Sequence, residues 1–80
     1  MQVQDRIREI INNLEVLDVS IDGVQDNDDL EFHGMNSLRW VKLLVTLEKE
    51  FGIKFDDAFL MKDENNTIKE LVHYVEAIIR

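Results

Sequence analysis

Ser37 is the residue of this chain whose type and position point most directly to chemistry. It begins a strongly apolar stretch, 37–51, whose periodicity predicts a helix. A hydroxyl at a helix start can accept a hydrogen bond from the free N–H groups of the first turn, and Asn36 can serve as this cap equally well. The positive end of the helix dipole would favour a negative charge there.

Nucleophilic catalysis at Ser37 is not expected. A serine nucleophile needs a base beside it and a third group that orients the base. His33 lies four residues before Ser37, but it is a single neighbour, and no orienting group is evident in the sequence. We therefore predict that the chain is not an enzyme.

A second pattern could bind a metal ion. Oxygen-bearing side chains occupy positions 1, 3, 5, 9 and 12 of an EF-hand calcium loop, with Gly23 at position 6. These candidate ligands are Asp18, Ser20, Asp22, Asp26 and Asp29. Against calcium binding, position 12 is Asp rather than the bidentate Glu, and Gly34 interrupts the expected exit helix. The calcium loop therefore stands as an alternative, and neither histidine has further ligands at metal-like spacing.

Four helical segments are predicted to position these residues. Apolar residues recur at helical spacing in 3–16, 37–51 and 68–79, and a short helical turn is predicted at 57–62. Gly52 is placed to end the second helix, and the capping box Thr67-x-x-Glu70 precedes the last. We expect an all-α four-helix bundle, with three main helices and one short one, in a single domain of residues 1–80.

A long ordered loop is predicted between the first two main helices, over residues 17–36. Five apolar side chains are expected to pin it to the core: Val19, Ile21, Val24, Leu30 and Phe32. After the second helix, Ile53 and Phe55 are expected to enter the core. A loop of this length usually has a function.

The chain resembles the acyl and peptidyl carrier protein family. The resemblance is carried by Gly34-Met35-Asn36-Ser37-Leu38 and, one helix later, by Leu47-Glu48-Lys49-Glu50-Phe51-Gly52-Ile53. The family pattern is Gly-x-Asp-Ser-Leu, a helix, and then Leu-Glu-x-x-Phe-Gly-Ile. In that family the serine carries a 4′-phosphopantetheine arm, so the resemblance implies that Ser37 is the attachment point. It further implies a bundle of acyl-carrier type that tethers acyl or aminoacyl intermediates as thioesters.

The resemblance also implies partners. They are a phosphopantetheinyl transferase, an acyl- or aminoacyl-loading ligase, and the synthase or transferase enzymes of a pathway. The apolar residues of 37–51 are too many for one core face, so we expect an exposed docking patch beside Ser37. Its predicted members are Asn36, Leu38, Arg39, Trp40, Val41, Lys42 and Val45. Trp40 fits the core as well as the patch.

Three positions depart from the family pattern. Asn36 stands where the family usually has aspartate, and an unmodified adaptor of carrier fold is therefore kept as an alternative function. Arg39 and Lys42 stand where fatty-acid carriers typically have acidic residues, which basic patches on fatty-acid synthase enzymes recognise. Reversed charges repel such partners and select others. We therefore predict service in a polyketide, nonribosomal-peptide or related specialised pathway.

Composition narrows the class of protein. With 80 residues and 45% hydrophobic residues but no proline or cysteine, stability must come from packing in one small core. The net charge of −8 disfavours binding to nucleic acid and to anionic membranes. No run of 18 apolar residues could span a membrane. We expect a free-standing cytoplasmic monomer. Its acidic stretch has no Lys or Arg between Arg8 and Arg39, which predicts a solvated loop first and a docking surface second.

Overall fold

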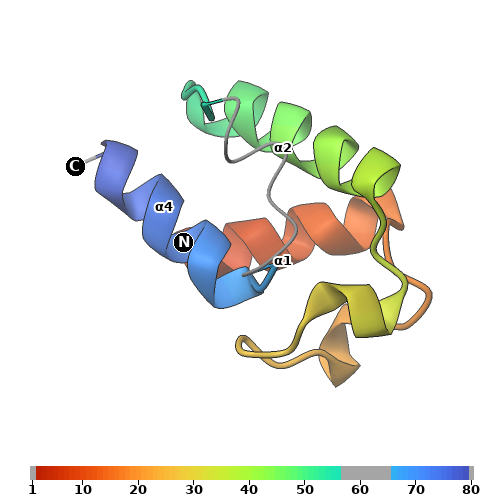
Figure 1. Ribbon diagram of the computed structural model, residues 1–80. Coiled ribbons are helices and arrows are strands. Elements are labelled where there is room, and N and C mark those ends of the chain that lie inside the picture. Colours follow the sequence, from red (N-terminus) through yellow and green to blue (C-terminus); the bar gives the residue numbers. More distant parts are fainter. Residues whose placement is uncertain (1, 57–65, 80) are drawn as a thin grey trace.

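Helices make up the regular structure of the protein, as the sequence predicts. The computed structural model describes residues 2–56 and 66–79, and the elements within these ranges are all helical (Figure 1). The three long helices are α1 (Val3–Leu14), α2 (Ser37–Phe51) and α4 (Ile68–Ile79). Helix α1 packs against both α2 and α4. The all-α fold with three main helices is confirmed, and the short helix predicted at 57–62 lies outside the described residues.

Local signals set the ends of α2 and the start of α4. Helix α2 begins directly after Asn36 and ends at Gly52, which adopts the left-handed conformation with φ 65°. Both ends are where the sequence predicts them, because a polar cap and a terminal glycine are strong boundary signals. At the start of α4, the Thr67 hydroxyl accepts the backbone N–H of Glu70 at 3.1 Å, which is one half of the predicted capping box.

Helix α1 is shorter than predicted. It ends at Leu14 rather than near residue 16, because Glu15 takes the left-handed conformation with φ 54°. The turn at Glu15 redirects the chain so that Val16 is buried in the core as part of the following loop. The apolar side chain of Val16, which prolonged the helical pattern, is therefore a core residue outside the helix.

The long loop between α1 and α2 contains two short 3-10 helices, η1 (Ile21–Gly23) and η2 (Leu30–His33). Of the side chains predicted to pin it, Val24 and Leu30 are buried in the core and Ile21 packs against it. The prediction was wrong for Val19 and Phe32, which are exposed. Alternation of apolar residues in a loop does not determine which side chains turn inward, since no regular period relates them.

Arg8 attaches this loop to α1. Its guanidinium donates to the backbone carbonyl oxygen of Val24 at 2.9 Å and forms an ion pair with Asp26 at 2.6 Å. The same side chain donates to the carbonyl oxygen of Ile21 at 3.3 Å. Gln4 of α1 also donates to the carboxylate of Asp26, so two side chains of α1 hold the middle of the loop.

A single apolar core lies between the three long helices. Its buried members are Ile7, Ile10, Ile11, Val16, Val24, Leu30, Met35, Trp40, Leu43, Leu44, Leu47, Ile53, Phe55, Ile68, Leu71 and Val75. Ile53 and Phe55 enter this core as predicted, and the Phe55 ring stacks on that of Tyr74 with ring centroids 5.0 Å apart. Within the described residues, no helix is long and apolar enough to cross a lipid bilayer.

Candidate functional site

Ser37 is the first residue of α2, and its side chain is exposed to solvent. The cap of the helix is Asn36, whose side-chain oxygen accepts the backbone N–H of Arg39 at 2.9 Å. Within the described part of the chain, the Ser37 hydroxyl makes no hydrogen bond to the protein. The choice that the sequence left open is therefore resolved: Asn36 caps the helix and the Ser37 oxygen is accessible from outside.

The electrostatics of the α2 N-terminus suit an anionic substituent. Free backbone N–H groups and the positive end of the helix dipole lie there, and the first turn contains no acidic side chain. At an exposed site this arrangement favours a negative charge by about 0.3–1 kcal/mol. A phosphodiester joined to the Ser37 oxygen would fit this position, since it is anionic and needs only access and an unshared hydroxyl.

The segment before Ser37 has a well-defined backbone. Helix η2 ends at Gly34, whose φ of 102° lies in the left-handed region that favours glycine. The next residue, Met35, is buried, and its N–H donates to the carbonyl oxygen of Leu30 at 3.0 Å. The N–H of Asp18 donates to the carbonyl oxygen of His33 at 2.8 Å. The bond from Asp18 joins the segment to the start of the long loop.

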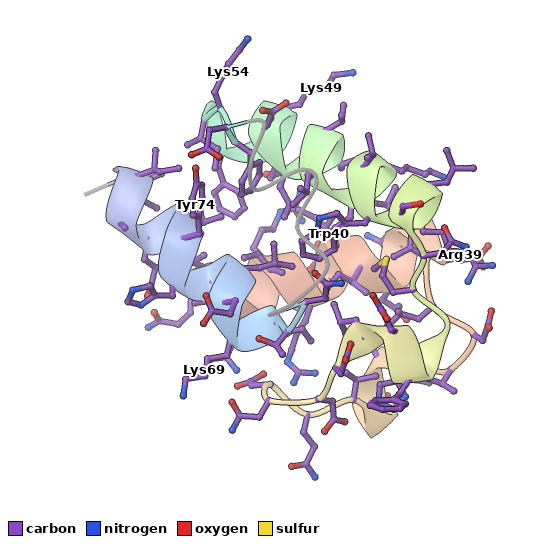
Figure 2. The ribbon with its side chains drawn as sticks, in the orientation of Figure 1. Arg39, Trp40, Lys49, Lys54, Lys69 and Tyr74 are labelled. Atoms are coloured by element: carbon purple, nitrogen blue, oxygen red, sulfur yellow. The ribbon has the colours of Figure 1, made fainter. Side chains whose placement is uncertain are left out.

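Arg39, on α2, makes further contacts with both the segment before Ser37 and the start of the long loop. We call these contacts, together with the bond between Asp18 and His33, the junction. The Nη1 atom of Arg39 lies 2.9 Å from the carbonyl oxygen of Gly34, 3.0 Å from a carboxylate oxygen of Asp18 and 3.3 Å from the carbonyl oxygen of Val16. Figure 2 shows the side chain at the first turn of α2, beside the segment that follows α1. Sequence reasoning placed Arg39 in the docking patch and missed these contacts. One signal was available, because Arg39 is the first cation after a long stretch of carboxylates.

An exposed apolar strip runs along α2 from Ser37. Leu38 is 80% exposed, and Val41 and Val45 are 41% and 39% exposed. With the exposed Lys42, these residues form what we call the α2 patch. Trp40 does not belong to it: the side chain is 3% exposed and points into the core (Figure 2), which corrects its prediction as a docking residue. Its place on α2 aligns it with Leu43, Leu44 and Leu47 rather than with Leu38.

His33 is engaged by the loop rather than by Ser37. Its Nε2 atom lies 3.0 Å from a carboxylate oxygen of Asp28. Asp28 also accepts the backbone N–H of Gln25 at 3.0 Å. These two hydrogen bonds, with that from Gln25 the larger cause, hold the pKa of the Asp28 carboxyl below its ordinary value. Among the described residues, the His33 ring is thus not paired with the Ser37 hydroxyl as base and nucleophile.

The calcium-loop alternative is not supported, because its candidate ligands turn to separate partners. Asp18 faces Arg39, Asp26 pairs with Arg8, and Asp29 accepts the backbone N–H of Glu31 at 3.0 Å. The hydroxyl of Ser20 accepts the N–H of Asp22. In the part of the chain that the structure describes, no group of three or more His, Asp or Glu side chains is placed to hold a metal ion.

Comparison with known proteins agrees with the geometry of the Ser37 site. A family model described as a phosphopantetheine attachment site matches residues 5–75. The mitochondrial acyl carrier protein of Saccharomyces cerevisiae is 34% identical over 77 residues, which cover 92% of this chain and 60% of the yeast protein. The aminoacyl carrier protein of Agrobacterium fabrum is 32% identical over 73 residues, 91% of this chain and 88% of that protein.

A third relative matches over nearly its whole length. The D-alanyl carrier protein of Leuconostoc citreum is 32% identical over 79 residues, which cover 99% of this chain and 99% of that protein. No solved structure matches the chain at a significant level. The match thus spans most of the Agrobacterium and Leuconostoc proteins but only part of the yeast protein, and the names of the three relatives state different cargoes.

Proposed function

The chain belongs to the carrier protein family that bears a phosphopantetheine attachment site, and on this premise we propose that Ser37 is the attachment residue. Proteins of this family are carriers rather than enzymes, and 4′-phosphopantetheine is their covalent cofactor. Once attached, the arm supplies a terminal thiol on which carboxylic acids are carried as thioesters. The role of the protein is to present the arm and to be recognised by the enzymes that load and use it.

One observation supports this proposal above the others: the Ser37 hydroxyl is exposed at the start of α2 while Asn36 serves as the cap. The serine is thus free of a structural task that modification would disrupt. In the loading step, the Ser37 oxygen forms a bond to the pantetheine-side phosphorus of coenzyme A. The pyrophosphate bond breaks, adenosine 3′,5′-bisphosphate leaves, and the hydroxyl proton is released. The N-terminal end of α2 favours the charge of the phosphodiester product.

Loading in vitro tests the attachment site. The purified protein is incubated with coenzyme A and a broad-specificity phosphopantetheinyl transferase, and its intact mass is measured. The wild type should gain one phosphopantetheine, and Ser37→Ala should gain none. Ser20→Ala is the matched control because Ser20 is the other serine of the chain and is also exposed. A mass gain in the Ser37→Ala protein would overturn the proposal.

The adaptor alternative predicts a protein that is never modified. Asn36 suggested this alternative, but the amide of Asn36 caps α2 as an aspartate would, so the substitution leaves the presentation of Ser37 unchanged. The intact mass of the protein isolated from its own host separates the two functions. A phosphopantetheine adduct on Ser37 requires the carrier function, whereas an invariably unmodified protein requires the adaptor.

For the pathway, we infer a specialised system rather than general fatty-acid synthesis. Lys42 carries a positive charge within the α2 patch, and in the described residues no carboxylate lies within ion-pair distance of it. The charge of Arg39, by contrast, is paired with Asp18. An apolar strip with one unpaired cation fits an enzyme surface that is apolar with a carboxylate beside it. The names of the relatives, which include acyl, aminoacyl and D-alanyl carriers, are compatible with several cargoes.

Comparison of partner enzymes tests this inference. Fatty-acid synthase enzymes with a basic docking surface should turn over the loaded protein poorly, because the positive charge of Lys42 is repelled by that surface. Ligases and synthases from the gene neighbourhood of the host should use it well. Equal turnover by both sets of enzymes would contradict the inference without affecting attachment at Ser37.

A further inference from the structure

We propose that Arg39 is a positioning residue for the loading of Ser37, acting through the backbone of the segment that leads into α2. The proposal rests on attachment at Ser37 and adds a residue that determines how well the hydroxyl is presented. It assigns Arg39 a role inside the protein in place of the docking role that its exposed neighbours suggest.

The contacts of Arg39 join two segments that are distant in sequence. The Gly34 carbonyl belongs to the entry into α2, whereas Val16 and Asp18 follow α1, 23 and 21 residues before Arg39. One nitrogen, Nη1, lies within hydrogen-bond distance of all three acceptors, so two N–H groups are shared among them. A guanidinium between two carbonyl oxygens and a carboxylate forms charge-assisted hydrogen bonds, which are stronger than neutral ones.

The backbone of Arg39 is restrained as well as its side chain. Its N–H is held by the Asn36 cap at 2.9 Å, and its guanidinium holds the carbonyl of Gly34. Ser37 lies between these two attachments and makes no side-chain hydrogen bond of its own within the described residues. The position of its oxygen therefore depends on the restraints at Asn36 and Arg39 rather than on contacts of the serine itself.

Asp18 contributes to the junction next to Gly34 through both its backbone and its side chain. The Asp18 N–H donates to the carbonyl oxygen of His33, while the Asp18 carboxylate receives Arg39. Without the guanidinium, the Gly34 carbonyl and the Asp18 carboxylate would each lose a donor, and the loop could separate from the start of α2. We infer that Ser37 would then sample conformations that a transferase does not bind.

This mechanism predicts a particular kinetic signature. A transferase that binds only the closed conformation sees an apparent KM raised by the inverse of the closed fraction, with kcat unchanged. We expect Arg39→Gln to raise the KM for the carrier about tenfold and to change kcat less than about twofold. Arg39→Lys should recover part of the loss, because an ammonium reaches some of the acceptors but lacks the planar fork.

Asp18→Ala distinguishes positioning from docking. If Arg39 held Ser37 through the junction, removing Asp18 would raise KM in the same direction as Arg39→Gln, and the double variant would be no worse than Arg39→Gln alone. If Arg39 were instead a cation that contacts the transferase, removing Asp18 would leave the Arg39 charge unpaired. The KM would then be unchanged or lower than that of the wild type. Lys49→Gln, an equal loss of charge in the last turn of α2, is the matched control.

The experiment measures kcat and KM for loading with coenzyme A, at a temperature where every variant is folded, together with hydrogen exchange of backbone amides. Arg39→Gln should accelerate exchange at the Asp18 amide while the core amides of α4 stay protected. A KM within about twofold of wild type, or faster exchange throughout the chain, would overturn the positioning role. Failure of the wild type to be loaded, or loading of Ser37→Ala, would instead overturn attachment at Ser37.

Discussion

Asp18 lies directly against Gly34. A β-carbon placed on Gly34 would fall 2.9 Å from the backbone nitrogen of Asp18 and 2.5 Å from its carboxylate carbon. Both distances are too short for non-bonded contact, so residue 34 must lack a side chain. The entry into α2 is therefore constrained by close packing as well as by the left-handed conformation of the glycine.

Gly34→Ala should destabilise the protein more than Gly52→Ala. Both glycines have positive φ, of 102° and 65°, so each alanine pays the left-handed penalty of about 1–2 kcal/mol. At Gly52 no atom lies within 4 Å of the added carbon, whereas at Gly34 Asp18 must also move. Urea unfolding measures the difference, with Gly23→Ala as a control that has neither problem. Equal losses at 34 and 52 would contradict the close packing.

Asn36→Ala and Asn36→Asp should have opposite effects. Removal of the cap costs about 1 kcal/mol of unfolding free energy, because the Arg39 N–H loses its acceptor. Aspartate keeps an acceptor and adds a negative charge at the positive end of α2, which favours folding by about 0.3–1 kcal/mol. Aspartate also matches the family pattern, so loading by a broad-specificity transferase should be faster in Asn36→Asp. Thermal unfolding and loading rates check both effects.

Much of the fold followed from local sequence signals. Helix α2 was predicted to the residue because Asn36 and Gly52 mark its ends, and the start of α4 because Thr67 caps it. The end of α1 was misplaced because Glu15 carries no local signal for a left-handed conformation. That conformation is set by the burial of Val16, which is a tertiary requirement.

The candidate site was predictable only in part. Sequence identified Ser37 and the α2 patch, since both lie on one predicted helix. It did not identify the contacts of Arg39, because two of its three acceptors are backbone carbonyl oxygens more than four residues away. Every residue has such a carbonyl, so the amino-acid types at these positions do not indicate the contact. Trp40 was assigned to the patch because helical spacing alone leaves it at the border of the buried face, and three-dimensional packing decides on which side it lies.

Trp40→Ala should unfold the protein far more readily than Leu38→Ala. Trp40 is buried, and truncating such a side chain costs about 3–5 kcal/mol through lost contacts and the cavity left behind. Leu38 is 80% exposed, so its truncation should change stability by no more than about 0.5 kcal/mol. Urea unfolding followed by circular dichroism measures both. A large loss of stability in Leu38→Ala would contradict the exposure of the α2 patch.

Lys42→Glu should shift partner preference without affecting the fold. The charge reversal replaces the unpaired cation of the α2 patch with the sign that basic synthase surfaces attract. Turnover of the loaded protein by fatty-acid synthase enzymes should rise about tenfold or more, mainly through a lower KM. Lys49→Glu makes the same change at the far end of α2 and should have little effect. Identical responses of the two variants would show that only net charge matters.

Stability should fall in acid, with a contribution from Asp28. The hydrogen bonds from Gln25 and His33 lower the pKa of this carboxyl below its ordinary value of 3.8. A lowered pKa in the folded state means that Asp28 stabilises the fold above pH 3.8, and that this contribution is lost as the pH falls through the folded-state pKa. Asp28→Asn cannot titrate, so its melting temperature should decline less than that of the wild type below pH 3.8. Thermal melts from neutral pH downward make the comparison.

The burial of Trp40 has a practical consequence. It is the only tryptophan in the chain, and it lies three residues after Ser37, about one turn further along α2, with its side chain buried in the core. Its intrinsic fluorescence therefore arises from one location, one helical turn from the exposed serine and shielded from solvent. Any enzyme or cargo that displaces α2 from α1 would alter the emission spectrum, so movements at this end of the protein can be followed in real time without an added dye.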